Sequence, residues 1–180
     1  MRYFNENDVR NFSKSIILEK YAFSQKSFAD SFDVFLSHSS KDKDVLTSAI
    51  NFLSEYGINV YIDKQDEKLP ERTSTETALV LKERITEARK FIVLVSRNSK
   101  DSRWIPWELG IADEKKKIKN IAILPIVQSN GALEWPEQEY LGIYPSVVNA
   151  KFAGQQNNVW MVYDRHSNKG TELGRWLRDE

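Results

Sequence analysis

The stretch FIVLVSRNSKDSRWIPWELG, residues 91–110, decides the fold. Its first five residues, Phe91–Val95, are all apolar and mostly aliphatic, which is typical of a strand buried on both faces. A polar turn follows, and then a segment with apolar residues at helical spacing. Trp104 and Glu108 stand four residues apart in that segment, so a helix would place them on one face. The stretch therefore predicts a buried strand that leads into a helix whose first turn presents an indole and a carboxylate together.

Three more apolar runs of the same kind are separated from it by segments with helical spacing: Asp33–Ser37, Ile58–Asp63 and Ile121–Val127. Strands that alternate with helices of about 10 to 15 residues predict parallel pairing and helices on both faces of the sheet. Further along the chain, Val159–Tyr163 and an apolar stripe ending at Leu177 predict a fifth strand and a last helix. We therefore expect an α/β protein with a flavodoxin-like, doubly wound parallel sheet of about five strands.

Length and composition favour one globular domain and exclude several classes of function. The chain has 180 residues, of which 41% are hydrophobic and none is cysteine, so we expect a core but no disulfide or thiolate metal site. Its 26 basic and 26 acidic side chains cancel, so no overall field would attract nucleic acid or an anionic membrane. The N-terminus is too polar for a secretion signal, and every apolar run is far shorter than the roughly 20 residues that span a bilayer. We expect a cytoplasmic protein that binds neither nucleic acid nor membrane and holds no metal.

The strand and helix pattern leaves both ends of the chain to be assigned. Residues 1–30 contain one amphipathic stretch, with Val9, Phe12, Ile16 and Ile17 at helical spacing. We expect a helical extension that packs on the domain; an arm that contacts another subunit is the alternative. The domain itself is expected to run over residues 31–180, with its main motifs in 31–150 and the last strand and helix in 151–180.

Polar residues follow each of the expected strands. They are Ser37-His38-Ser39-Ser40, Asp63-Lys64, Ser96-Arg97 and Gln128-Ser129. In doubly wound parallel sheets, ligands bind at the carboxyl ends of the strands, so these groups and the start of the Trp104 helix are expected to share one edge. The sequence predicts a polar cleft with a carboxylate and an aromatic ring.

The composition of this cleft points to glycosidic chemistry. The chain has no phosphate-binding loop, dinucleotide fingerprint, zinc-protease or serine-hydrolase motif. A carboxylate can stabilise the cation that develops on a sugar carbon. A second acid is needed only to protonate the leaving group, and a pyridinium such as that of NAD leaves neutral without a proton. One glutamate would then suffice. The plainer interpretations are that Glu108 is a first-turn acid favoured by the helix dipole and that Trp104 is a core residue.

The chain resembles a TIR (Toll/interleukin-1 receptor/resistance) domain over about Ser31–Ala150. The matching segments occur in order: SFDVFLSHSSKD at 31–42, GINVYID at 57–63, ARKFIVLVSRNSKDSRWIPWELGIA at 88–112, the apolar run 121–127, and EWPEQEYLGI at 134–143. The third of these is similar to the WxxxE helix of enzymatic members. Each segment is weak by itself, but the ordered set is specific.

The resemblance implies an enzyme that cleaves NAD, as substrate rather than cofactor, with Glu108 as the catalytic residue. It also implies a set of residues that contact NAD: Ser37, His38, Ser39, Asp63, Trp104 and Trp135. Several of these have a structural alternative, since His38 also suits a loop, Asp63 a capping role and Trp135 loop packing. Many relatives carry an arginine in the first loop where this chain has Ser39-Ser40. A phosphate contact is then missing or comes from Arg72, Lys41 or Arg97.

Other functions remain open at this point. TIR domains also act as non-enzymatic adaptors that assemble through the loop after the second strand, here Asp66–Thr77, although pure adaptors generally lack the WxxxE glutamate. A phospho-receiver is excluded because Ser96 stands where it needs an aspartate. The resemblance extends to bacterial TIR proteins of Thoeris-type antiphage defence. It implies that the protein self-associates and that a separate effector senses the nucleotide product. The alternative is a virulence effector that acts on host TIR signalling. Hydrolysis, cyclisation and transfer of ADP-ribose are not distinguished.

Overall fold

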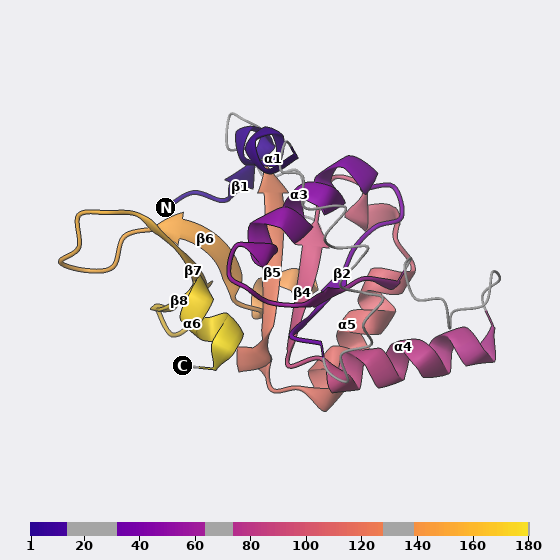
Figure 1. The fold of residues 1–180 in the computed structure, drawn as a ribbon. Coiled ribbons are helices and arrows are strands. Elements are labelled where there is room, and N and C mark those ends of the chain that lie inside the picture. The colour runs from indigo at the N-terminus through magenta and orange to yellow at the C-terminus, as the bar shows by residue number, and fades with distance from the viewer. Residues whose placement is uncertain (14–31, 64–73, 128–138, 180) are drawn as a thin grey trace.

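Strands and helices alternate along the chain in the computed structural model, which describes residues 1–13, 32–63, 74–127 and 139–179 (Figure 1). The elements are β1 (Phe4–Asn5), α1 (Glu6–Ser13), β2 (Val34–Ser37), α3 (Lys43–Ser54), β3 (Val60–Tyr61), α4 (Thr75–Glu87), β4 (Lys90–Val95), η2 (Ser99–Asp101), α5 (Trp104–Lys115), η3 (Ile118–Asn120), β5 (Ile121–Val127), η4 (Glu139–Ile143), β6 (Ser146–Ala150), β7 (Val159–Asp164), β8 (Lys169–Glu172) and α6 (Leu173–Arg178). This is the α/β arrangement that the sequence predicts.

One sheet runs through the molecule in the order β3-β2-β4-β5-β6-β7-β8. Pairing is parallel from β3 to β6, so these five strands form the expected parallel sheet. The prediction that Val159–Tyr163 completes that sheet is wrong: this segment is a strand, but it pairs antiparallel with β6 and then with β8. The fifth parallel strand is β6, Ser146–Ala150. Its register with β5 is a single pair, Ile123 with Ser146, because β5 exchanges partners along its length.

Helices cover both faces of the sheet, and the alternation of side chains in β4 shows why. Ile92 and Leu94 belong to the core under α1, α3 and α6, whereas Phe91, Val93 and Val95 belong to the core under α4 and α5. All five are fully buried. Because successive side chains of a strand point to opposite faces, a continuous apolar run fits only a strand covered on both sides. In the described part of the chain, no helix is long and apolar enough to cross a membrane.

Local sequence signals set the ends of the helices. Ser74 begins α4 with a reciprocal capping box, in which the Ser74 and Thr77 hydroxyl oxygens each accept a hydrogen bond from the other residue's backbone N–H. Gly57 has a φ of 71°, and its N–H donates to the carbonyl of Ser54, the last residue of α3. This left-handed conformation favours glycine, which agrees with the predicted end of that helix. Pro106 lies in the first turn of α5, where its missing amide has no helical partner to lose.

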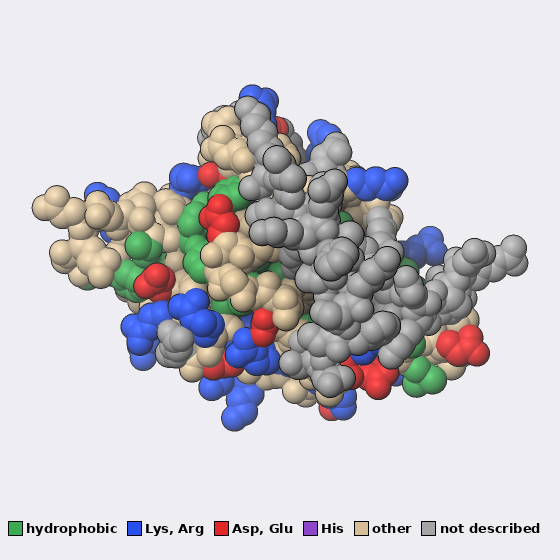
Figure 2. Space-filling model, viewed as in Figure 1, with side chains coloured by type: hydrophobic (Ala, Val, Ile, Leu, Met, Phe, Trp, Pro, Cys, Tyr) green, Lys and Arg blue, Asp and Glu red, His purple; other side chains and the backbone are tan. Residues whose placement is uncertain are grey.

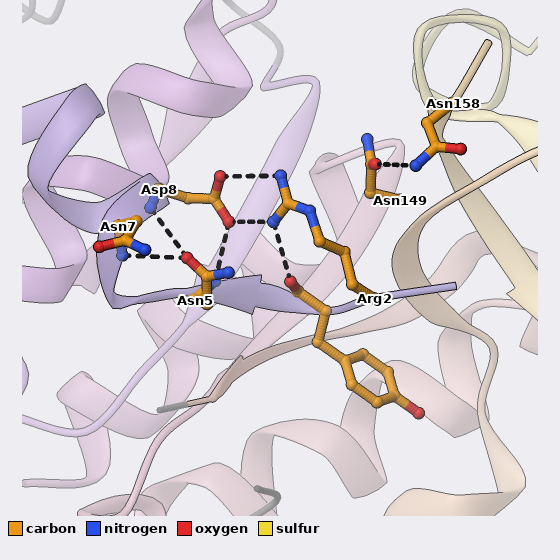
Figure 3. A network of polar contacts seen from close by, with 7 residues as sticks. Arg2, Asn5, Asn7, Asp8, Asn149 and Asn158 are labelled. Carbon is orange, nitrogen blue, oxygen red and sulfur yellow. Dashed lines mark hydrogen bonds and ion pairs between the residues drawn. The ribbon is translucent and has the colours of Figure 1, made fainter. Parts of the chain in front are cut away.

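The N-terminal segment is part of the sheet and its helical layer. β1 pairs parallel with the end of β5, Phe4 with Ile126. Helix α1 packs on α3, where Ser48 Oγ and Asn51 Nδ2 donate to the backbone carbonyls of Val9 and Phe12. Figure 3 shows a polar network at the same place, in which the Arg2 guanidinium faces the Asp8 carboxylate. The sequence prediction for Ile16 and Ile17 lies outside the described residues.

Candidate active site

The carboxyl ends of β2 and β4 bring the candidate site residues to one edge of the sheet. Ser37, the last residue of β2, pairs in register with Val93 of β4. Because the strands are parallel, the residues that follow each of them leave the sheet on the same side. Helix α5 follows the loop after β4, packs against β2 and β4, and carries Glu108 on its second turn. Two segments far apart in the sequence thus meet where ligands bind in folds of this type.

Ser37 and Glu108 are in direct contact. The Ser37 hydroxyl donates a hydrogen bond of 2.5 Å to a carboxyl oxygen of Glu108. Only 1% of Ser37 and 3% of Glu108 are exposed. The expectation that Glu108 looks outward from the helix is therefore wrong: the face of α5 that carries it packs inward, together with Ile105, Leu109 and Ala112.

Burial changes the acidity of Glu108. Desolvation raises its pKa from 4.5 to about 7; the hydrogen bond from Ser37 opposes the rise, and the charge of Asp63 adds to it. Near neutral pH this carboxyl is therefore present in both its protonated and its ionised form. A group with that property can hold negative charge or exchange a proton under physiological conditions.

His38 and Asp63 form a second pair at this edge. His38 Nε2 lies 3.8 Å from an Asp63 carboxylate oxygen, and Nδ1 lies 3.2 Å from the backbone carbonyl of Leu36. The carbonyl can only accept, so it favours a proton on Nδ1. The imidazole is almost completely buried, whereas about a third of the Asp63 side chain is exposed. Because Asp63 also raises the pKa of Glu108, the structure brings four of the predicted site residues into one electrostatic group.

Ser39 is turned into its own loop. Its hydroxyl oxygen lies 3.4 Å from the backbone N–H of Lys41, and its carbonyl accepts from Asp42 N–H. The structure places Ser39 next to His38 and buries it, but gives it no contact with Glu108. Of the residues considered for a phosphate contact, Lys41 is exposed and lies 3.6 Å from Asp101, and Arg97 is exposed.

Asp42 is a positioning residue that the sequence reasoning missed. Its carboxylate is 1% exposed and accepts hydrogen bonds from Ser96 Oγ at 2.8 and 2.7 Å and from Asn98 Nδ2 at 2.6 Å. These bonds tie the loop after β2 to the loop after β4. An aspartate directly before a helix is the usual sign of a cap, but here the side chain makes no cap hydrogen bond and crosses to the neighbouring loop instead.

Trp104 lies at the start of α5 and is partly buried. Its ring meets that of Trp107 edge to face, with the centroids 5.3 Å apart. Trp107 in turn carries the Lys82 ammonium over its ring at 5.9 Å. Trp104 therefore packs against the core while part of its side chain stays exposed, an arrangement that is compatible with a place both in the core and at the site.

Some predicted residues lie outside the described part of the chain. These are Trp135, Arg72, Gln128, Ser129 and most of the Asp66–Thr77 segment. For the described part, the arrangement amounts to a buried carboxyl poised near neutral pH, a hydroxyl that donates to it, and a histidine and aspartate beside it. Such a group suits stabilisation of a cation on a bound sugar.

Comparison with known proteins identifies the family to which the chain is similar. Residues 34–168 match the family model described as TIR domain. The chain is 34% identical over 178 residues to the "Probable 3' cyclic ADP-D-ribose synthase ThsB'" of Bacillus cereus (strain MSX-D12), covering 89% of this chain and 91% of that protein. It is also 34% identical over 89 residues to the "Putative cyclic ADP-D-ribose synthase TIR2" of Cytobacillus dafuensis, covering 48% of this chain and 24% of that protein. The TIR domain of the Toll-related receptor TRR-2 from Hydra magnipapillata is a weak structural match, with a TM-score of 0.46, 18% identity, and coverage of 64% of this chain and 84% of that one.

Proposed function

Because the chain belongs to the TIR domain family, we propose that it cleaves the bond between nicotinamide and ribose in NAD and releases the remainder as a cyclic ADP-ribose signal. The names of the Bacillus and Cytobacillus relatives support a cyclic product. The observation that carries the proposal is the buried Glu108 carboxyl, held by Ser37 Oγ at 2.5 Å, at the sheet edge where doubly wound proteins bind ligands.

The proposed reaction uses Glu108 as a source of negative charge. When the bond between ribose C1′ and the pyridinium nitrogen breaks, its electron pair stays with nicotinamide, which leaves as a neutral molecule. The Glu108 carboxylate stabilises the positive charge that develops on C1′. A hydroxyl of the same molecule then bonds to C1′ and loses its proton, which closes the ring; water in its place would give ADP-ribose. With its pKa raised to about 7, Glu108 is suited to accept that proton.

We further propose that the neighbouring residues hold the substrate. Trp104 would stack on nicotinamide with the exposed part of its indole, and His38 and Asp63 would line the ribose side of the site. Their positions beside Glu108 support this role. Ser39 and Trp135 are proposed as further contacts on the basis of the family resemblance alone.

The biological setting is proposed on the same basis. We propose that the protein acts in the cytoplasm of a bacterium in antiphage signalling, that it self-associates through TIR contacts, and that a separate effector senses its product. The resemblance to Thoeris-type TIR proteins and the two bacterial relatives support this setting.

The test is chromatography of nucleotides after concentrated protein has been incubated with NAD. The Glu108→Gln variant is compared with Glu114→Gln, which makes the same chemical change at an exposed position on the same helix. We expect nicotinamide release and a cyclic ADP-ribose species from the wild type and from Glu114→Gln, and neither from Glu108→Gln.

The co-product separates the possible reactions, since ADP-ribose alone would identify a hydrolase. Equal release from all three proteins would remove Glu108 from the reaction. No release from any of them, at high concentration and with a crowding agent, would contradict the proposal and favour the adaptor function.

A further inference from the structure

A groove lies at the amino edge of the sheet, opposite the edge that carries Glu108. Its volume is about 430 Å³, and its walls come from the first residue of β4, from residues before β5 and β6, from β7 and β8, and from α6 and the residue that follows it. Lys90 and Asn120, which start or directly precede β4 and β5, form its inner end. Because β4 has six residues at about 3.3 Å each, the groove is separated from the candidate active site by about 20 Å of sheet.

The inner end of the groove buries a cation. Lys90 is 2% exposed. Its Nζ donates a hydrogen bond of 2.8 Å to Asn120 Oδ1 and forms an ion pair with Asp179. The ammonium also lies 5.0 Å from the centroid of the Trp176 ring. These contacts hold the Lys90 side chain in place, and the Asp179 carboxylate is engaged in the ion pair with it.

The rim of the groove carries three more cations, Lys119, Lys169 and Arg175. All three are exposed, and no carboxylate among the described residues lies within ion-pair distance of them. Lys and Arg side chains gather in this region around α6 (Figure 2). Like charges held side by side repel one another, so a bound anion would stabilise the groove.

The two carboxylates that line the groove already have partners. Asp179 is paired with Lys90. Asp164 accepts a hydrogen bond from Ser167 Oγ at 2.5 Å and from the backbone N–H of His166 at 2.9 Å, and these bonds lower its pKa. Both acids stay ionised, but the described lining has four cations against these two carboxylates, so it keeps an excess of positive charge.

We propose that this groove binds the diphosphate group of a small ligand. Lysine and arginine make charge-assisted hydrogen bonds to phosphate oxygens, and a groove of this size admits a small molecule rather than a single ion. The Thr171 side chain adds a hydroxyl to the wall. Trp176 offers no open ring face for a base, because it is 7% exposed and its indole N–H donates to the Lys119 carbonyl. Recognition therefore depends on the phosphates, whether the diphosphate is free or part of a nucleotide. This proposal does not rest on Glu108 or on NAD cleavage.

The test is calorimetric titration of inorganic pyrophosphate into the full chain. Lys169→Gln/Arg175→Gln removes two rim cations, and Arg10→Gln/Lys151→Gln removes the same charge from exposed positions outside the groove. We expect the wild type and the control to bind alike and the groove variant to bind at least about tenfold more weakly, with all affinities falling as salt is raised. Circular dichroism checks that both variants are folded, and Lys119→Gln repeats the test if the double variant is not.

Parallel titrations with ADP and adenosine distinguish the sources of the diphosphate. Groove-dependent binding of ADP about tenfold tighter than that of pyrophosphate would identify a nucleoside diphosphate, and equal binding would identify the diphosphate itself. Groove-dependent binding of adenosine as tight as that of ADP would overturn the proposal. Equal pyrophosphate affinity in the groove variant and the control would also overturn it.

Discussion

The two edges of the sheet each bury an ionisable side chain, and they differ in what lies beside it. At the amino edge, the Lys90 ammonium has the Asp179 carboxylate and the Trp176 ring around it. At the carboxyl edge, the Glu108 carboxyl has the neutral Ser37 hydroxyl, and no Lys or Arg of the described residues lies within ion-pair distance. Burial raises the pKa of Glu108 to about 7, and the single hydrogen bond from Ser37 only partly opposes that rise. Both groups are buried, so the two edges differ in that Lys90 has a carboxylate partner whereas Glu108 has no cationic partner among the described residues.

The largest contrast between the two edges should be seen in catalysis. Glu108→Gln should lower nicotinamide release from NAD by about a thousandfold or more, because the amide cannot supply negative charge to the developing cation. Asp179→Asn, at the other edge, should change the rate by less than about twofold, since the groove takes no part in the proposed reaction. The rate of nicotinamide release under saturating NAD measures both. A comparable loss in the two variants would contradict the division of roles.

The stability of Glu108→Gln should depend on pH in a defined direction. The pKa of this carboxyl is 4.5 in the unfolded chain and about 7 in the folded one, so the folded state holds its proton longer. Both states are protonated below about pH 4.5, and the wild type loses stability as pH rises through 7. Above that pH the Gln variant should be more stable by about 3 kcal/mol, because the pKa differs by about 2.5 between the two states and each pKa unit corresponds to about 1.4 kcal/mol. Urea unfolding of both proteins at about pH 4 and about pH 8.5 measures this difference. The same difference between variant and wild type at both pH values would show that Glu108 is not buried as an uncompensated charge.

Replacing the hydroxyl beside Glu108 should have a smaller effect. Ser37→Ala removes a hydrogen bond that lowers the pKa of Glu108, so the pKa should rise further. The pH profile of kcat/KM, which rises as Glu108 ionises, should then move to higher pH, and activity at pH 7 should fall about three- to tenfold. Ser37→Thr, which keeps the hydroxyl, is the matched control. A lower rate with an unmoved pH profile would assign Ser37 a role in binding instead.

The smallest effect should follow the loss of the counter-charge at the amino edge. Asp179→Asn should destabilise the protein by about 1 kcal/mol, because Lys90 keeps the Asn120 contact and because solvent screens Asp179, whose side chain is 54% exposed. Thermal unfolding measures the change. A loss as large as the gain expected for Glu108→Gln would mean that burial alone sets the cost of a charge at both edges.

The sequence could predict the strands and helices whose signals are local. Phe91–Val95 becomes most of β4 because a continuous apolar run suits only a strand covered on both faces. β6 was missed because Ser146–Ala150 has three positions that are only half-buried and so lacks that run. β1 has two residues, too few for any periodicity, and its partner in β5 lies far along the chain. Val159–Tyr163 was predicted as a strand, but the residues of a strand do not indicate whether it pairs parallel or antiparallel with its neighbour.

The candidate site was predictable only in part, for the same reason. The edge position of Ser37, His38, Asp63 and Glu108 follows from the order of strands and helices. The burial of Glu108 does not, because a helix with apolar residues nearly all around it, such as Trp104–Lys115, gives no clear polar face on which to place a carboxyl. The role of Asp42 depends on the approach of two loops 54 residues apart, which only the folded chain reveals.

The pairing of β1 with β5 affects the order in which a newly made chain can fold. Phe4 meets Ile126, and the backbone of Arg2 meets that of Asn149, so this segment finds its partners only after more than 100 further residues have been made. At about 5 to 20 residues per second, synthesis keeps this segment without its strand for several seconds or more. Contacts of such long sequence separation also slow folding. β1 should therefore join the sheet only after β5 has been made.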